Sequence, residues 1–382
     1  MTKFVQIHTL VSYPPSNLNR DDLGRPKTAV MGGTQRLRVS SQSLKRAWRT
    51  SDLFMQSFCD NFGIRTKEMG AYLYKALTSG VKLIDLINCN DDAKEVNPKV
   101  PDDTTKEWVE YIAGSFGKVE DVNTLKTEQI VSFYPEEILA IDEIVTRISK
   151  RDESLEEVLS LLRKEKTKDA KKRNYNNVLG LLLEKQKAVD IAMFGRMLAA
   201  NPKFNTEAAV QVSHAITVNE VAVEDDYFTA VDDLNRGEEN LGSAHLGETE
   251  FASGLFYTYV CVDCELLKSN LGGDEELANK ALRALVEAMA KVSPTGKQNS
   301  FASRAYASYM MIEKGKQQPR SLSVSYLEPI RGRSMLKSAI DALIQTNDNM
   351  EKVYGKCCED RKDMNAYTGE GSLDEMLDFV VN

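Results

Sequence analysis

Two residue types that often catalyse reactions are scarce in this chain, whose 382 residues include only three histidines and six cysteines. His8 and His214 fall within strand-like patterns, and we expect both to be structural. Cys261 and Cys264 have the spacing of a metal-binding pair, but no second pair matches it, so buried free thiols are favoured. Thr295-Gly-Lys-Gln298 lacks the first glycine and the final hydroxyl residue of a phosphate-binding loop. Enzyme signatures are thus mostly absent, and we expect no metal and no cofactor.

A basic stretch near the N-terminus carries the strongest chemical signal. Residues 19–49 hold eight basic and two acidic side chains, a charge of +6 in a chain of net charge -8. A cationic patch in an acidic protein indicates a negatively charged partner. Glycines and a proline mark residues 19–33 as loop and turn, and the alternation over Arg36–Val39 predicts a short strand.

The helix expected after this strand offers polar groups for an anion. Ser40 or Ser41 can cap a helix that begins near Gln42, and Gln42, Lys45 and Arg49 then share one face. A hydroxyl, an amide and two cations at a helix start suit a phosphate, because free N–H groups and the helix dipole favour an anion there. The alternative is a solvated basic loop followed by an ordinary amphipathic helix.

One acidic pair, Asp21 and Asp22, lies inside the basic stretch. These carboxylates could hold a divalent metal near a phosphate. Ion pairs with Arg20 or Arg25 are the favoured interpretation.

A core of strands and helices must position these residues. Residues 4–11 predict a buried strand and residues 42–58 a helix, whereas residues 52–184 show helical periods and predict a helical insertion of about 130 residues. Within it, a helix beginning at Pro135 carries an apolar stripe, and Ser154 can cap another helix. The stripe consists of Ile138, Ile141, Val145 and Ile148. Residues 163–173 hold seven basic and two acidic residues, which either bind a nucleic-acid backbone or form a solvated helix end or loop.

Strand patterns return in the second half of the chain, at residues 189–197, 208–218, 254–262 and 322–326. The segment between residues 219 and 250 is too long for a tight turn, and we interpret it as a protruding hairpin. It is acidic, and its adjacent rings Tyr227 and Phe228 could stack on bases from the hairpin tip or pack on a protein neighbour. One helix follows Asp274, and two more end the chain, the last capped by Ser372.

The composition is that of a globular protein, with 42% hydrophobic and 28% charged residues. No run of about 18 apolar residues predicts a membrane span. The few, irregularly spaced cysteines fit reduced thiols in the cytoplasm. Without the insertion and the hairpin, the element order approaches the β-α-β-β-α-β plan of RNA-recognition domains, so we predict an α+β fold.

Several motifs, taken in order, resemble the CasC family, whose members form the repeated backbone of the type I-E CRISPR Cascade complex. The resemblance spans most of residues 1–300. The segments that carry it are Asn19-Arg-Asp-Asp22, Gly32-Gly33, Arg38-Val-Ser-Ser-Gln-Ser-Leu-Lys-Arg46, Asp190-Ile-Ala-Met-Phe-Gly-Arg-Met197, Ser213-His-Ala-Ile-Thr217, Phe228-Thr-Ala-Val-Asp-Asp-Leu234, Gly242-Ser-Ala-His-Leu-Gly247 and Phe251-Ala-Ser-Gly-Leu-Phe-Tyr257.

The resemblance implies a hand-shaped protein with a palm of modified RNA-recognition (ferredoxin-like) fold, a helical fingers insertion and a protruding β-hairpin thumb. Copies stack head to tail along a CRISPR RNA, beside other Cascade subunits, and present it to target DNA. A separate helicase-nuclease then cuts the DNA, and the subunit itself is not an enzyme. The implied boundaries are residues 1–51 for the first part of the palm, 52–186 for the fingers, 187–216 for palm strands, 217–249 for the thumb, and 250–382 for the rest of the palm and the C-terminal helices.

The resemblance also implies where RNA binds. The expected contacts are Arg20, Lys27, Ser40, Gln42, Lys45, Arg49, Met197, Tyr227, Phe228 and Thr229. The basic run of the fingers is expected to hold target DNA through Lys164, Lys166, Lys168, Lys171 and Lys172. Two alternatives stay open: a type III-like backbone subunit that cuts target RNA with Asp21 or Asp22, and a stand-alone single-stranded RNA-binding protein.

Overall fold

The computed structural model of the chain contains helices and a large antiparallel sheet, which confirms the predicted α+β class. It describes residues 3–58, 61–121, 123–150, 160, 180–184, 187–199, 201–230 and 245–382. Two compact units are present. The first comprises Met1–Ser57, Val210–Glu265 and Glu276–Asn382, and the second comprises Phe58–Ala209 and Leu266–Glu275. Within the described ranges, no helix is both long and apolar enough to cross a membrane.

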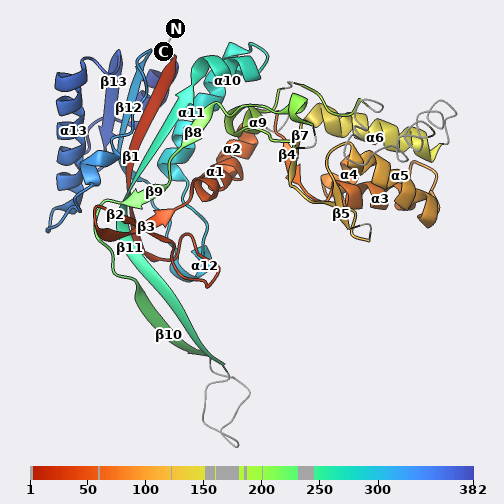
Figure 1. Ribbon diagram of the computed structural model, residues 1–382, viewed down its shortest axis with the longest axis horizontal. Coiled ribbons are helices and arrows are strands. Elements are labelled where there is room, and N and C mark those ends of the chain that lie inside the picture. Colours follow the sequence, from red (N-terminus) through yellow and green to blue (C-terminus); the bar gives the residue numbers. More distant parts are fainter. Residues whose placement is uncertain are drawn as a thin grey trace, which may run out of the picture. The chain divides into compact units, whose positions relative to one another are not determined.

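The first unit is built on a sheet of order β13-β12-β1-β11-β9-β3-β2, in which each strand is antiparallel to its neighbours in this order (Figure 1). The central strand β1 is rich in valine, isoleucine and leucine and is buried along most of its length, as a strand covered on both faces must be. The strands are β1 (Phe4–Ser16), β2 (Thr28–Met31), β3 (Thr34–Val39), β8 (Val210–Val212), β9 (Ala215–Thr217), β10 (Glu224–Ala230), β11 (His245–Asp263), β12 (Ala307–Gly315) and β13 (Asp360–Asn365).

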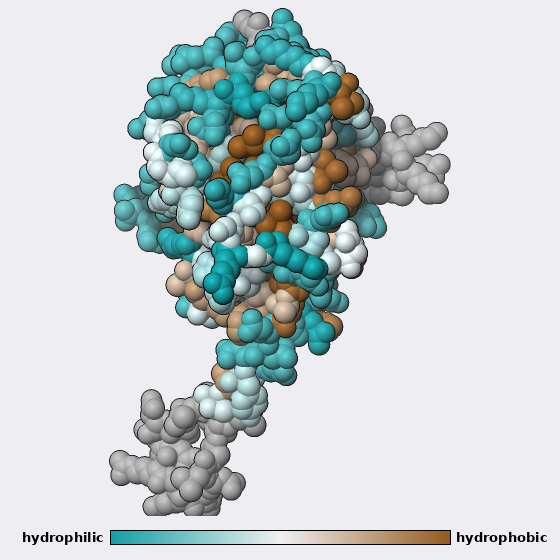
Figure 2. Space-filling view, turned by 90° about the vertical axis from the view of Figure 1, so that its left-hand side faces the viewer, coloured by the Kyte–Doolittle hydropathy of each residue, from teal (hydrophilic) through white to brown (hydrophobic). Residues whose placement is uncertain are grey.

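Helix α13 (Met335–Tyr354) packs on one face of this sheet. Its Ala339, Ile340 and Leu343 join a buried cluster with strand residues such as Leu10 and Tyr309. Figure 2 looks onto the side of the molecule that carries α13 in Figure 1, where hydrophobic side chains are scattered among hydrophilic ones. The other helices of this unit are α1 (Ser41–Arg49), α2 (Asp52–Ser57), most of α11 (Glu275–Lys291), α12 (Gln298–Phe301), the 3-10 turn η3 (Ser323–Tyr326) and α14 (Leu373–Val381).

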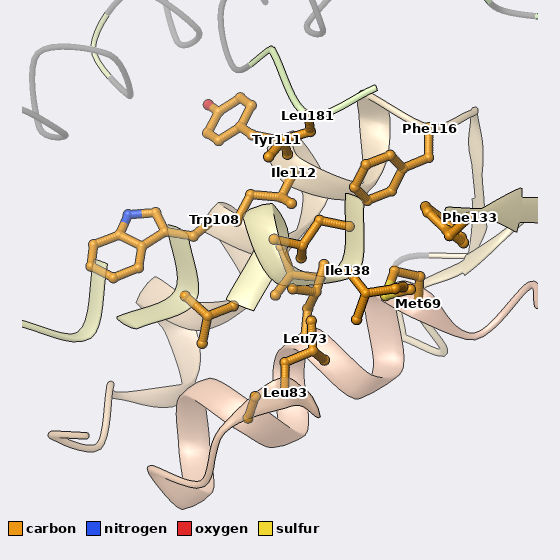
Figure 3. Close-up of a cluster of buried hydrophobic side chains, with 14 of the residues drawn as sticks. Met69, Leu73, Leu83, Trp108, Tyr111, Ile112, Phe116, Phe133, Ile138 and Leu181 are labelled. Atoms are coloured by element: carbon orange, nitrogen blue, oxygen red, sulfur yellow. The ribbon is translucent and has the colours of Figure 1, made fainter. Parts of the chain in front are cut away.

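The second unit contains the predicted helical insertion, with four short strands that the sequence did not indicate. Its hydrophobic core gathers large side chains such as Phe116, Phe133 and Ile138 (Figure 3). All four residues of the apolar stripe on α6 are buried, which confirms that helix. The elements are α3 (Met69–Ser79), α4 (Leu83–Ile87), α5 (Asp102–Gly114), α6 (Pro135–Ser149), α9 (Val189–Phe194), α10 (Cys264–Asn270, mostly in this unit), η2 (Pro202–Phe204), β4 (Ile64–Thr66), β5 (Val119–Asp121), β6 (Lys126–Thr127) and β7 (Val131–Phe133).

Four predictions of local structure are wrong. Residues 28–31, which were predicted to belong to loop and turn, form strand β2 and pair with β3. Residues 189–197 were predicted as a strand, but Val189–Phe194 forms helix α9. The expected strand at residues 322–326 is instead the 3-10 turn η3. The tight turn brings the side chains of both Leu322 and Tyr326 into the same buried cluster. The single helix expected over residues 42–58 is two helices, α1 and α2, separated at Thr50 and Ser51. The helix expected after Ser154 lies outside the described residues.

Candidate nucleic-acid interface

The loop formed by residues 19–27 is held in shape by its own backbone. Lys27 N donates to Asn19 O at 2.8 Å, and Asp21 N donates to Arg25 O at 2.9 Å. The buried amide of Asn17 donates to the carbonyl of Gly24 at 2.9 Å. These bonds fix where the loop presents Arg20, which is exposed, and Lys27, which is half-buried.

The acidic pair does not pair with the arginines of this loop as expected. Asp21 Oδ1 accepts hydrogen bonds from the backbone N–H groups of Leu23 and Arg25 at 3.0 and 2.9 Å, so its carboxylate shapes the turn. Arg25 Nε instead lies 3.0 Å from a carboxylate oxygen of Glu250, on strand β11. Asp22 is exposed.

Helix α1 begins where the sequence predicted. Ser40 is its N-cap, and its hydroxyl oxygen accepts from Ser43 N at 3.3 Å. Ser40 N in turn donates to Asn19 Oδ1 at 2.9 Å, which ties the helix start to the basic loop. Ser40 is 8% exposed. Its two hydrogen bonds give it a structural role in addition to any contact with a ligand. The predicted face of the helix, Gln42, Lys45 and Arg49, carries one exposed and two half-buried side chains.

The two arginines on strand β3, Arg36 and Arg38, differ in burial. Arg36 is fully buried, and its guanidinium donates to Thr34 Oγ1, Thr217 O and Tyr326 O at 2.9, 2.9 and 3.1 Å. Burial lowers its pKa. Arg36 thus belongs to the core of the first unit, although it is one of the eight basic residues of the stretch 19–49.

Arg38, which the predicted contacts did not include, lies closer to the surface. Its Nη1 is 2.9 Å from Nδ1 of His214, an exposed residue between β8 and β9. Burial and the nearby charges of Arg38 and Lys27 lower the pKa of His214. Near neutral pH its imidazole is therefore uncharged, accepts from Arg38 at Nδ1 and carries its hydrogen on Nε2. His214 is thus exposed, and the structural role expected for it stays a prediction. The alternating sequence pattern predicted that His214 lies on a strand, but it did not indicate that Arg38 is its partner.

A cleft of about 600 Å³ opens beside the basic loop. One of its walls is formed by residues 295–297, whose sequence does not match a phosphate-binding loop. Arg20, Asp22 and Ser43 line it together with Thr295 and Lys297. Gly296 explains the close approach of this segment, because a Cβ there would lie 2.1 Å from the carbonyl oxygen of Leu18. The weak similarity of residues 295–298 to a phosphate-binding loop was the only sequence signal that pointed to Lys297. That similarity did not indicate that this segment packs against the basic loop, which is the contact that requires Gly296.

The expected protruding hairpin is present, and its second strand, β11, continues into the central sheet (Figure 1). Tyr227 and Phe228 lie within strand β10, opposite Glu248 and Gly247, and not at the tip as we considered. Tyr227 is 65% exposed, and Phe228 is 43% exposed with its ring over Gly247. Thr229 is exposed on the same strand. The residues beyond Ala230 and before His245 lie outside the described ranges.

Met197 belongs to the second unit and is 73% exposed. The preceding Arg196 anchors it: this buried guanidinium contacts both carboxylate oxygens of Glu137 at 2.8 Å and stacks over the ring of Tyr134. The five lysines predicted to bind DNA, Lys164, Lys166, Lys168, Lys171 and Lys172, lie outside the described residues.

Possible metal ligands come together at Glu313, Glu351 and Cys358, the one such group among the described residues. Arg361 Nη2 contacts both carboxylates, at 2.8 and 2.6 Å, and Arg320 Nη1 also contacts Glu313. These guanidinium groups already supply the positive charge, so the cluster is a buried ion network and not a cation site.

A family model and two solved structures match nearly the whole chain. A family model described as "CT1975-like protein" matches residues 5–377. One solved structure, titled "CRISPR RNA-guided surveillance complex, pre-nicking", contains a chain 27% identical, with 99% of each chain covered and a TM-score of 0.75. A second, "CRISPR RNA-guided surveillance complex", is 23% identical over 98% of this chain and 99% of that one, with a TM-score of 0.56, and supports the fold alone. Comparison with curated sequences found no match. Because the family model covers nearly every residue, from strand β1 to helix α14, the chain belongs to the CT1975-like protein family, Cas_CT1975.

Proposed function

We propose that this protein is a guide-RNA-binding backbone subunit of a CRISPR RNA-guided surveillance complex. The observation that carries this is the similarity in fold over 99% of both chains to a subunit of such a complex. In this proposal the first unit supplies the palm, with the thumb hairpin at residues 217–249, and the second unit supplies the fingers. The motif resemblance extends the proposal to type I-E, with copies that stack head to tail in the cytoplasm beside other Cascade subunits.

The palm surface supports RNA binding through charge. Arg20, Lys27 and Arg38 lie on or next to a loop of fixed shape, and Lys45 and Arg49 follow on helix α1. We call these five residues the palm edge. Phosphate groups are held by such cations without regard to base sequence. Repeated head-to-tail contacts that do not close produce an open helical filament, which suits a linear guide.

Recognition of target DNA then belongs to base pairing with the bound guide, as in other RNA-guided systems. The lysines of residues 163–173 hold the DNA backbone, and the subunit does not cut it. A recruited helicase-nuclease supplies the chemistry. This division explains why a basic, non-enzymatic surface is sufficient for the subunit's task.

Native mass spectrometry of the chain expressed with its CRISPR RNA and partner subunits tests the proposal. We expect one RNA with several copies of this chain, and we expect Lys45→Glu with Arg49→Glu to prevent assembly. Lys337→Glu combined with Lys352→Glu is the matched control, because both lysines are exposed on α13, which carries none of the predicted RNA contacts. Copies of the chain that never associate with RNA would contradict the backbone role. RNA-bound monomers that do not polymerise would support a stand-alone RNA-binding protein.

Cleavage of target RNA is the second candidate, because exposed Asp22 lines the cleft next to Arg20 and Lys297. A carboxylate beside cations can hold a divalent ion near a phosphate. We expect the assembled complex to leave complementary RNA intact in the presence of magnesium. Cutting that disappears in Asp22→Asn but persists in Asp21→Asn would favour the type III-like alternative.

A further inference from the structure

The cleft of about 600 Å³ beside the basic loop contains polar groups that phosphate binding alone does not use. Its lining comes from three parts of the first unit, namely the basic loop, Ser43 on α1 and residues 295–297. Arg20 belongs both to this lining and to the palm edge, so the two surfaces are continuous. A cleft of this size lies within the range that holds a small molecule or one nucleotide.

The two carboxylates that line the cleft differ in their hydrogen bonds. Asp21 Oδ1 accepts from the backbone N–H groups of Leu23 and Arg25, which fixes the turn. The carboxylate of Asp22 has no hydrogen-bond or ion-pair partner in the part of the chain that the structure describes. A carboxylate repels phosphates, so the favourable contact that Asp22 can make with a nucleic acid is with a hydrogen-bond donor.

The composition of the lining indicates which part of a nucleotide the cleft suits. None of the described residues that line it is aromatic, so the cleft offers no ring on which a base could stack. Sugar and phosphate remain, and contacts to them do not depend on base sequence. The ribose 2′-hydroxyl can donate a hydrogen bond, and it is the group by which proteins distinguish RNA from DNA. An acidic side chain binds a ribose hydroxyl in the same way in dinucleotide-binding folds.

Arg20 and Asp22 are two positions apart on the loop, and both line the cleft. In an RNA strand the 2′-hydroxyl is attached to the carbon next to the one that bears the 3′-phosphate. One nucleotide therefore presents a hydrogen-bond donor and an anion side by side. A carboxylate and a guanidinium group in one cleft complement these two groups, and both contacts are charge-assisted hydrogen bonds.

We propose that Asp22 accepts a hydrogen bond from the 2′-hydroxyl of one nucleotide of the bound RNA, while Arg20 holds the phosphate beside it. The inference rests on the proposed RNA-binding function and adds to it a residue that selects RNA over DNA. This selection reads the sugar and no base, so it suits a guide of any sequence. It also requires no cleavage of the RNA.

Binding of two matched single strands of about twelve nucleotides to the full chain tests this role, because single-strand sites of one domain span roughly 4–16 nucleotides. One strand is RNA. The other carries 2′-fluoro groups, which cannot donate a hydrogen bond but keep the sugar in its RNA-like conformation. We expect the native chain to bind RNA about tenfold more tightly, near the lower limit for a hydrogen bond to a charged group. In Asp22→Ala the two affinities should become equal.

Two further variants separate the hydrogen bond from the charge. Asp22→Asn loses the charge but keeps an accepting oxygen, so it should retain about a threefold preference, because bonds to neutral acceptors are roughly half as strong. Asp21→Asn removes the same charge from the same turn and keeps an oxygen for the N–H groups of Leu23 and Arg25. It is the matched control, and its preference for RNA should stay at the native value.

The salt dependence of the preference gives a second readout. A bond between a hydroxyl and a carboxylate releases no counterions, so the ratio of the two affinities should stay constant between about 50 and 200 mM salt while both affinities fall. Thermal unfolding of each variant confirms that it folds.

The outcomes separate this inference from the proposed function. If the native chain binds both strands equally, if Asp22→Ala keeps the native preference, or if the preference disappears with salt, the inference is wrong. If the native chain binds neither strand, the proposed function itself fails.

Discussion

The palm edge and the thumb hairpin carry opposite charge, although strand β11 runs through the base of both. At the palm edge, cations lie on a loop and a helix that the sheet holds in place. On the thumb, Glu224, Asp225 and Asp226 follow one another on β10, opposite further acids such as Glu250 on β11. Phosphate binding suits the first surface and is implausible on the second. In the proposed function, the thumb would therefore contribute to RNA binding through its rings or through contact with a basic neighbour.

The two surfaces also meet at one place, where the charges neutralise each other. Arg25 of the palm loop pairs with Glu250 at the base of the thumb, and Lys297 Nζ lies 3.2 Å from Thr249 Oγ1. Asn17 donates to the carbonyl of Glu250 at 2.9 Å. Cations in this part of the chain therefore have two roles: Arg25 and Lys297 fasten the thumb to the palm, and those of the palm edge form the proposed phosphate-binding surface.

The largest expected effect tests the support beneath the palm edge. Arg36→Met removes a buried guanidinium and leaves the carbonyls of Thr217 and Tyr326 without their donor, which we expect to lower the free energy of unfolding by about 3 kcal/mol. Chemical denaturation of the full chain measures it. Arg38→Met, on the same strand, should change stability far less and weaken RNA binding instead. Equal losses of stability in both variants would erase the distinction between them.

A second prediction concerns the charge of the palm edge. Lys45→Ala combined with Arg49→Ala should reduce the salt dependence of RNA binding by about 1.4 units, since each phosphate contact with a single strand contributes roughly 0.7. The measurement is RNA affinity against salt concentration, compared with Lys337→Ala combined with Lys352→Ala on α13. A slope that stays at the native value would exclude both residues from phosphate contact.

The third prediction concerns the shape of the thumb. A Cβ at position 247 would lie 2.3 Å from the ring of Phe228, so Gly247→Ala must displace that ring and should destabilise the hairpin by about 1 kcal/mol. Hydrogen exchange of the β10 amides should accelerate while exchange in β1 stays constant. Phe228→Ala in the same chain should relieve most of the effect. Without such relief, the ring is not what Gly247 accommodates.

A smaller gain is expected from the charge of the thumb. Asp225 lies directly opposite Glu250, and like charges in that position are unfavourable. Asp225→Thr should slow exchange of the hairpin amides by an amount equivalent to about 0.5 kcal/mol. Asp226→Thr, which faces Thr249, is the matched control and should have less effect. A loss of stability in Asp225→Thr would mean that this carboxylate is paired favourably.

The smallest effect is expected for the thumb rings in RNA affinity. Stacking is worth roughly 1–3 kcal/mol per base, but unstacking a neighbouring step costs a few kcal/mol, so the terms nearly cancel. Replacing Tyr227 and Phe228 by Ala should therefore leave affinity nearly native. In the assembled complex it should abolish periodic tolerance of mismatches between guide and target. Mismatch scanning along the target measures this, and a periodic pattern in the double variant would assign both rings to packing alone.

Local patterns in the sequence were sufficient for several elements. The apolar stripe on α6, the serine cap of α1 and the paired glycines of the β2–β3 turn, with φ of 60° and 77°, each depend on residues only a few positions apart. They failed where distant packing overrides local preference. Residues 189–194 are an apolar run interrupted only by Asp190, which resembles a buried strand, yet they form a helix whose residues are almost all buried. A short apolar segment that is buried all round carries no period that separates helix from strand.

The sequence by itself determined the class of the fold, the basic stretch and its separation from the acidic hairpin, because charge and hydrophobic period are properties of neighbouring residues. Only the tertiary structure decided how each charge is used. It buried Arg36, joined Arg38 to His214 across 176 positions of sequence, and fastened Arg25 to Glu250. Such pairings depend on which strands lie side by side, and strand order is fixed by packing of the whole sheet, which no local pattern records.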